Sequence, residues 1–271
     1  MSDNRPGYIY DPEWADERTR LAALERLNDP ATIKHLEATG VGPGWRCLEV
    51  GGGGGSITRW LSQRVGRNGS VVATDLDTRF LDEIEADNLE VRRHDILEDD
   101  LESTAFDLVH SRFLLEHLPR YREALGKMVT ALKPGGWLVV EDVDFASAIF
   151  GDPEQRPGVP AESIAVGVEL TSRMMLMASA RGIQPELGRR LPELFVEAGL
   201  TDVKAEGYTS WIWGGSEDSE VARLSLQHMT KLAVQAGLLT EEDRARYLRL
   251  VTDPEMGSFS PLRFGAWGRK P

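Results

Sequence analysis

The chain has 271 residues, of which 31 are basic and 44 acidic, so its formal net charge is −13. This balance disfavours a nucleic-acid backbone or an anionic membrane surface as the main partner, and a small or cationic ligand suits it better. The length allows one α/β domain of about 200–250 residues with additional segments. No stretch approaches the roughly 18 apolar residues of a membrane span, and Cys47 is the single cysteine. We therefore expect a cytoplasmic protein without disulfides.

The N-terminal residues are predicted to form an extended arm followed by two helices. Leucines recur at every third position from Leu21 to Leu27, and apolar residues resume at Ile33 after Pro30. Proline lacks the N–H donor of a helix interior, so we expect Pro30 to separate the two helices.

A run of five glycines lies between a strand pattern and a helix pattern in residues 47–60, CLEVGGGGGSITRW. Cys47 and Leu48 begin a short apolar run typical of a buried parallel strand, and helical spacing starts at Ser56. Glycine accepts positive φ and has no Cβ, so the loop could bring backbone N–H groups to a ligand at the positive end of the helix. A flexible linker would have no reason to join these patterns. We predict a loop that binds a small ligand.

The spacing of the glycines distinguishes between two kinds of nucleoside ligand. The dinucleotide fingerprint G-x-G-x-x-G fails, because its third glycine would fall on a serine or an isoleucine. The pattern Glu49-x-Gly51-x-Gly53-x-Gly55 instead closely resembles the E/D-x-G-x-G-x-G signature of class I S-adenosylmethionine-dependent methyltransferases. S-adenosylmethionine has no phosphates, so the resemblance implies that the helix end faces its carboxylate.

The resemblance also implies the fold. We expect a doubly wound, Rossmann-like α/β sheet of seven strands, mostly parallel with an antiparallel last strand, under a helical lid. The expected segments are an N-terminal arm and lid helices (1–40), the cofactor-binding core (41–144), a lid insertion (145–188), a return to the core (189–215), a second lid insertion (216–256) and the last core strand (257–271). Within the return to the core, we expect a helix over 192–198 and a strand over 203–213. The sequence departs from the family at Gly52 and Gly54, where other side chains are usual.

The second predicted strand, residues 70–75, ends at Asp75. A carboxylate at this place can accept hydrogen bonds from both vicinal hydroxyls of a ribose, so Asp75 is predicted to bind the ribose. By resemblance to the family, Leu76 would pack on the adenine. Asp77 is predicted to be the N-cap of a helix over residues 78–86.

The third and fourth predicted strands lead to the remaining cofactor contacts that the resemblance implies. Asp95 would accept a hydrogen bond from the adenine amino group, with Ile96 beside the ring. The fourth strand, FDLVHS, precedes a segment that matches the family's LEHLP motif, and the backbone at Ser111 and Arg112 would accept from the ammonium group of S-adenosylmethionine. The acidic run over residues 98–102 is predicted to be a solvated turn, because its spacing is not that of a metal site.

Substrate choice is expected to depend on the second half of the chain. A methionine-rich helix around Met174 and Met177 lies in the first predicted insertion. It could line an acceptor pocket together with Phe145, Trp211 and Trp213, or it could form a core. A pocket of this kind would take an apolar, aromatic or polyketide-like acceptor.

Methyl transfer from a sulfonium requires alignment and exclusion of water more than protein functional groups, and placement alone can contribute roughly 7–11 kcal/mol. A general base is optional and would add about two to four powers of ten in rate. None of the five histidines has metal-ligand spacing, so no metal is predicted, and the alternative is a metal at Asp142 and Asp144 after the fifth predicted strand. We predict that His117 or His228 assists deprotonation of the acceptor. The alternative for each is a structural histidine.

Three functions remain open at this stage. The leading one is a methyltransferase for a small metabolite, resembling the ubiquinone/menaquinone-biosynthesis type and bacterial natural-product enzymes of secondary metabolism. It would convert S-adenosylmethionine to S-adenosylhomocysteine, without nucleic-acid or membrane partners, as a monomer or homodimer. The second is an S-adenosylmethionine-binding protein that does not methylate, such as a cyclase. The third, a nicotinamide-dependent oxidoreductase, is disfavoured by the failed fingerprint.

Overall fold

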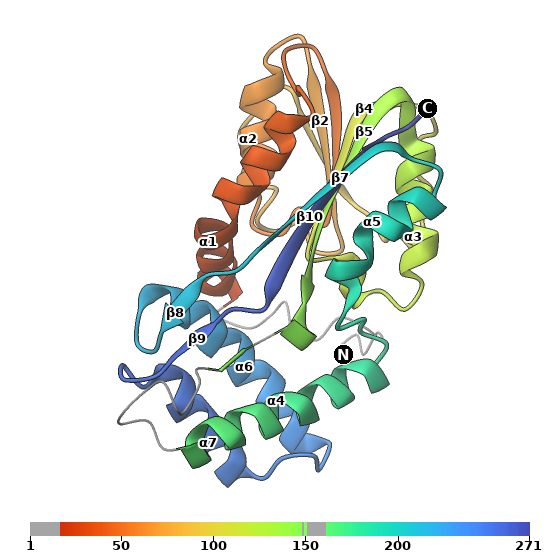
Figure 1. The fold of residues 1–271 in the computed structure, drawn as a ribbon. Helices are drawn as coiled ribbons and strands as arrows, with labels where there is room; N and C mark the ends of the chain where they lie inside the picture. Colours follow the sequence, from red (N-terminus) through yellow and green to blue (C-terminus); the bar gives the residue numbers. More distant parts are fainter. Residues whose placement is uncertain (1–16, 148, 151–160) are drawn as a thin grey trace.

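In the computed structural model, residues 17–147, 149–150 and 161–271 are described, and they are organised around one seven-stranded sheet (Figure 1). The sheet order is β3-β2-β1-β4-β5-β10-β7. Its strands are β1 (Arg46–Val50), β2 (Ser70–Asp75), β3 (Leu89–Arg93), β4 (Phe106–Arg112), β5 (Leu132–Asp144), β7 (Thr201–Tyr208) and β10 (Leu262–Arg269). The strands from β3 to β5 run parallel, while β10 is antiparallel to both neighbours. The predicted Rossmann-like sheet with an antiparallel last strand is confirmed.

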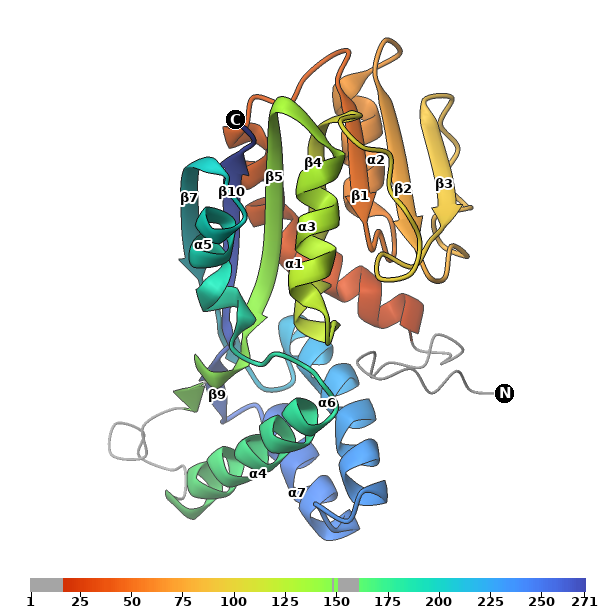
Figure 2. The ribbon, with the colours of Figure 1, turned by 90° about the vertical axis from the view of Figure 1, so that its right-hand side faces the viewer.

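Helices cover both faces of the sheet (Figures 1 and 2). These helices are α1 (Glu17–Ala38) and α2 (Ser56–Val65) on one face, and α3 (Tyr121–Ala131) and α5 (Leu187–Glu197) on the other. Alternate residues of a strand point to opposite faces, so Cys47 of β1 packs with α1 and α2 while Leu48 packs with α3 and α5. Both side chains are fully buried. A strand covered on both faces reads as a nearly continuous apolar run, which is why it was visible in the sequence.

A helical layer lies beyond the carboxyl ends of the parallel strands (Figure 2). It consists of α4 (Ala161–Ala180), α6 (Glu217–Gln235) and α7 (Glu241–Thr252), with a small sheet of β6 (Ile149–Phe150), β9 (Gly257–Phe259) and β8 (Trp211–Trp213) beside it. Two single-turn 3₁₀ helices, η1 (Leu115–His117) and η2 (Phe145–Ser147), follow β4 and β5. α6 also packs against α1. Within the described residues, no helix is both long enough and apolar enough to cross a membrane.

The methionine-rich helix α4 packs into a core of its own. Met174 and Met177 are 1% and 3% exposed and belong to a cluster with Met229 of α6 and Tyr247 of α7. Thr171 and Tyr247 are hydrogen-bonded at 2.7 Å between their hydroxyl groups. The two buried methionines therefore hold the helical layer together. Of the two alternatives for this helix, an acceptor pocket or a core, the structure shows the core.

The two helices expected before the first strand are one helix, and that prediction was wrong. α1 continues through Pro30, and side chains on both sides of the proline anchor it. Asn28 accepts a hydrogen bond from Arg263 Nη1 at 3.0 Å and donates one to the Leu24 carbonyl at 2.7 Å. Thr32 contacts the core through Glu141. These tertiary contacts outweigh the local cost of the proline.

Two other elements differ from the expectation. Residues 78–86 form turns and no helix, so Asp77 is not a helix N-cap; its Oδ1 accepts from Arg79 N at 3.2 Å within the turn. The strand expected over 203–213 is two strands in different sheets, since β7 ends at Tyr208 and Trp211 begins β8. The helix expected over 192–198 is the longer α5.

Candidate active site

The glycine loop between β1 and α2 turns back on the end of β2. Gly51 N and Gly52 N both donate to the Thr74 carbonyl, at 2.8 and 3.0 Å. Gly53 and Gly55 have φ values of +54° and +85°, in the left-handed region that disfavours other residues. The loop therefore requires glycine for its backbone shape, as the fingerprint implied.

Asp75 lies at the end of β2 and is held by the loop. Its Oδ2 accepts from Gly53 N at 2.9 Å and its Oδ1 from Asp77 N at 3.1 Å. Burial raises the pKa of Asp75, and hydrogen bonds from the backbone of Asp77, Gly53 and Leu76 oppose that rise. A carboxylate has about four acceptor positions, so Asp75 keeps capacity for a further donor. The geometry fits a carboxylate that accepts from ribose hydroxyls.

The residues predicted to meet the adenine lie in different environments. Leu76 is 40% exposed beyond the end of β2, so its side chain offers apolar surface for a ring. Ile96 is 5% exposed and packs in the core under α3. Asp95 is half-buried, and its Oδ1 accepts from Leu97 N at 3.0 Å. The contacts of these residues to a cofactor stay predictions.

Glu49 points into the protein rather than into the loop. It is 4% exposed, its Oε2 accepts from Thr58 Oγ1 of α2 at 2.5 Å, and its Oε1 lies 3.6 Å from His110 Nδ1 of β4. Glu49 thus fixes the strand and helix on either side of the loop. Its direct contact with the cofactor stays a prediction.

The end of β4 carries the residues predicted to face the ammonium group. Ser111 is fully buried, with its Oγ 3.9 Å from Met128 Sδ. Arg112 extends to α1, where its Nη1 donates to Asp29 Oδ1 at 2.9 Å. Phe113 has a φ of +54°, which is unusual for a bulky side chain, and its N–H donates to the Glu141 carbonyl at 2.7 Å. Such strain is often found at functional sites.

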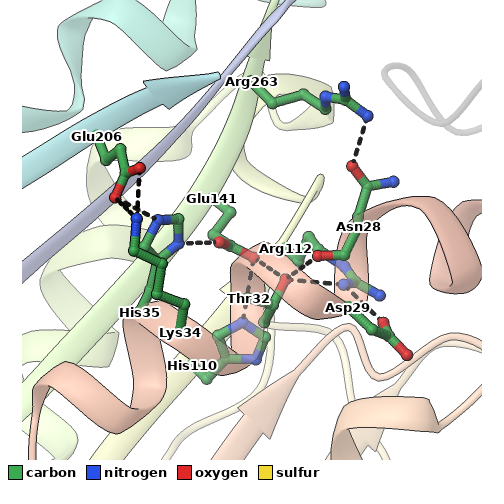
Figure 3. Close-up of polar contacts among 10 residues, drawn as sticks. All are labelled: Asn28, Asp29, Thr32, Lys34, His35, His110, Arg112, Glu141, Glu206 and Arg263. Carbon is green, nitrogen blue, oxygen red and sulfur yellow. Dashed lines mark hydrogen bonds and ion pairs between the residues drawn. The ribbon is translucent and has the colours of Figure 1, made fainter. Parts of the chain in front are cut away.

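A buried polar network joins α1 to the sheet beneath the loop, and sequence reasoning missed most of it (Figure 3). Glu141 of β5 is 1% exposed and hydrogen-bonds Thr32 Oγ1 and His35 Nδ1 of α1. His110 Nε2 lies 4.0 Å from Glu141 Oε2. Burial would raise the pKa of Glu141, but the imidazoles of His110 and His35 lower it to about 2. In the sequence, the only indication of this network is an acid or a histidine inside each of three apolar strands.

His117 lies in η1, which packs against α3, α5 and β5. Its Nε2 is 3.4 Å from Glu116 Oε1, while Glu116 Oε2 accepts from Val143 N at 2.7 Å. Burial, with a smaller effect of the Arg20 charge, lowers the pKa of His117 to about 4. Burial also raises the pKa values of Glu116 and Asp142 well above the ordinary range. The negative charge of Asp142 raises the pKa of Glu116 further. His117 is therefore neutral at pH 7 beside an acid pair.

His228 is half-buried on α6, a different element from His117, so its part in the site stays a prediction. Phe145 lies in η2, and Trp211 packs edge-on against Trp213 and Phe259 in the small sheet, with ring centroids 5.6 and 4.9 Å apart. Among the described residues, no group of three His, Cys, Asp or Glu side chains could hold a metal ion.

Comparison with known proteins identifies the family of the chain. A family described as "Methyltransferase domain" matches residues 8–205. Methyltransferase str2 of Strobilurus tenacellus is 28% identical over 228 residues, covering 83% of this chain and 76% of the relative. A ubiquinone/menaquinone biosynthesis C-methyltransferase, UbiE, of Ectopseudomonas mendocina is 34% identical over 113 residues, covering 39% of this chain and 44% of the relative.

Solved structures share the fold. A protein of Bacillus halodurans C-125, solved as a candidate methyltransferase, has a TM-score of 0.56 at 17% identity and covers 88% of this chain and 98% of its own. An S-adenosylmethionine-dependent methyltransferase from Aquifex aeolicus has a TM-score of 0.52 at 15% identity, and the match covers 97% of this chain and 100% of the Aquifex chain. Together, the matched family, the strand order and the glycine loop show that the chain belongs to the class I S-adenosylmethionine-dependent methyltransferases.

Proposed function

We propose that the protein methylates a small, apolar or aromatic metabolite, in secondary metabolism, as a cytoplasmic monomer or homodimer. The observation that carries the proposal is the arrangement of Gly53 and Asp75. The Gly53 N–H holds one carboxylate oxygen of Asp75 at the carboxyl end of β2, which neighbours β1, and the carboxylate keeps acceptor capacity for a ribose hydroxyl. In open α/β sheets, ligands bind outside the carboxyl ends of the strands at the switch point, which here lies between β1 and β4.

The acceptor class is supported by the charge of the chain and by its aromatic residues. A net charge of −13 disfavours polyanionic acceptors. Trp211, Trp213 and Phe259 form an aromatic cluster in the small sheet next to α6, and Trp213 is 49% exposed. The relative UbiE is named for ubiquinone and menaquinone biosynthesis.

Bound S-adenosylmethionine supplies the chemistry, an electrophilic methyl group on a sulfonium that reacts by direct in-line displacement. The chain's own residues contribute position: the glycine loop and Asp75 fix the nucleoside, and α1 closes one side of the site. His117 is neutral and can accept a hydrogen bond from an acceptor hydroxyl. With a pKa of about 4 it is a weak base at neutral pH, so alignment carries most of the rate.

The test has two stages. Isothermal titration should show binding of S-adenosylmethionine and S-adenosylhomocysteine, and incubation with a panel of phenols, quinols and polyketides should yield S-adenosylhomocysteine from at least one acceptor. Changing His117→Ala or His228→Ala should then lower turnover about tenfold or more, in line with loss of acid–base assistance, while donor affinity holds. Binding without S-adenosylhomocysteine formation from any acceptor would favour the non-methylating alternative. Unchanged turnover in both variants would mean that neither histidine acts as a base and that alignment of the donor and the acceptor accounts for the whole rate.

A further inference from the structure

Two carboxylates of α1 reach the start of α2. Glu25 Oε1 accepts from Ser56 N at 3.1 Å, and Asp29 Oδ1 accepts from Ser56 Oγ at 3.0 Å. Glu25 also touches the glycine loop, since a Cβ at Gly54 would lie 2.4 Å from its Oε1. This contact explains why glycine replaces the usual side chain at Gly54. Glu25 and Asp29 are one helical turn apart and share a face of α1, so the helix supplies an acidic wall to the loop.

A cation completes this group. Nη1 of Arg112, at the end of β4, lies 2.9 Å from Asp29 Oδ1 and 2.8 Å from Thr32 Oγ1 (Figure 3). The Arg112 and Asp29 side chains are 12% and 24% exposed, so a ligand can still reach them. β4 pairs with β1, which places Arg112 beside the loop that follows β1. One side of the loop thus presents two carboxylates and one guanidinium.

The charge at the start of α2 decides which end of an amino acid can bind there. A helix N-terminus attracts an anion, and Glu25 already supplies one at the Ser56 N–H. A second carboxylate at this point would be repelled by Glu25, whereas an ammonium group would be attracted. Burial raises the pKa of Glu25, and a nearby ammonium would offset that effect.

We propose that Glu25 and Asp29 select the α-ammonium group of S-adenosylmethionine and that Arg112 pairs with its carboxylate. The inference rests on the proposed function, because it assumes that the donor binds at the glycine loop. It differs from the expectation that the helix end faces the donor's carboxylate. It assigns recognition of an amino-acid zwitterion to α1 and β4, in addition to the backbone of the loop.

The test compares two ligands that differ only in the amino-acid part. S-adenosylhomocysteine carries it, and 5′-deoxy-5′-methylthioadenosine lacks it. Titrations would use the full chain, Glu25→Gln and Asp29→Asn, with Glu83→Gln as the control. Glu83 is 52% exposed and pairs with Arg18 of α1, so its loss removes an α1 contact away from the loop.

Glu25→Gln keeps an acceptor for Ser56 N and removes the charge. We expect it to weaken S-adenosylhomocysteine binding about tenfold, as for a charge-assisted hydrogen bond, and to leave methylthioadenosine binding within about twofold. Asp29→Asn should behave in the same way, and Glu83→Gln should match the wild type for both ligands. Thermal unfolding of each variant would show that it is folded. If Glu25→Gln does not fold, Asp29→Asn still tests the proposal.

Three results would overturn the proposal. Equal weakening of both ligands would mean that Glu25 only shapes the loop. Tighter S-adenosylhomocysteine binding by Glu25→Gln would mean that Glu25 competes with the donor's carboxylate. Failure of the wild type to bind S-adenosylhomocysteine or S-adenosylmethionine would overturn the proposed function itself, which distinguishes that failure from the other two.

Discussion

Nδ1 of His110 lies 3.6 Å from Oε1 of Glu49, on neighbouring parallel strands in the interior of the sheet. On its other side, His110 Nε2 faces Glu141, 4.0 Å away. A histidine between two buried carboxylates is stabilised in its charged form. The interior beneath the glycine loop therefore contains an ionic network.

The pH dependence of stability should reflect this histidine. Burial opposes its charge, but Glu141 and Glu49 raise the pKa of His110 in the folded protein. Its contribution is then fully present below its unfolded pKa of about 6.5 and is lost as pH rises through the raised value. The free energy of unfolding should fall over that range in urea titrations, and the fall should be absent from His110→Gln. An identical slope in both proteins would contradict the assignment.

Removing the charge of Glu141 should be costly. The variant Glu141→Gln removes one of the two buried carboxylates beside His110 and the charge that His35 Nδ1 contacts, and we expect a loss of about 3–5 kcal/mol in unfolding free energy. The control is Glu197→Gln, because Glu197 is 54% exposed and its pair with Arg122 should contribute about 0–1 kcal/mol. Chemical denaturation at pH 7 measures both. Equal effects would mean that the network contributes no more than a surface pair.

The shape of the glycine loop should matter more than its flexibility. Gly55 has a φ of +85°, and a Cβ there would lie 2.6 Å from Ile84 Cδ1. Gly55→Ala should therefore strain the loop by about 1–3 kcal/mol and weaken S-adenosylhomocysteine binding in titration. Gly126→Ala on α3 is the control: open space surrounds it, and it should stabilise the protein by about 0.4–1 kcal/mol without changing affinity. Unchanged affinity in Gly55→Ala would show that the loop tolerates other backbone shapes.

The helical layer should depend on its buried methionines. Met174→Ala would leave a cavity among α4, α6 and α7, with an expected cost of about 2–5 kcal/mol. Leu176 is on the same helix and 72% exposed, so Leu176→Ala should change stability by less than about 0.5 kcal/mol. Thermal unfolding of the two variants gives the comparison. A stable Met174→Ala with altered acceptor preference would instead support the pocket interpretation.

Sequence reasoning succeeded where local pattern and tertiary structure agree. The apolar strands, the glycine spacing and the acid at Asp75 depend on residues close together in the chain, and the structure places them as one loop and strand end. It failed where distant contacts override local preference. Pro30 does not end α1, because Asn28 and Thr32 anchor the helix to β10 and β5. Residues 78–86 have a helical pattern, yet Leu81 and Ile84 pack as turns against the glycine loop.

The sequence indicates that a buried polar network exists, but it does not show which residues contact one another. Glu49, His110 and Glu141 each interrupt an apolar strand, and buried ionisable groups need partners. Strand register then places Glu49 beside His110, but it does not show that His35 of α1 completes the network. The contact of Glu25 with α2 is also invisible in sequence, because it depends on how α1 crosses the sheet.

The position of β10 has a consequence for how the chain is made. β10 lies between β5 and β7 in the sheet, although α6 and α7 separate it from β7 in the chain. During translation, β7 cannot join the sheet until residues 262–269 have left the ribosome. Until then the nascent protein carries an open edge at β5, of the kind that pairs with other chains, so newly made molecules should depend on chaperones during this interval.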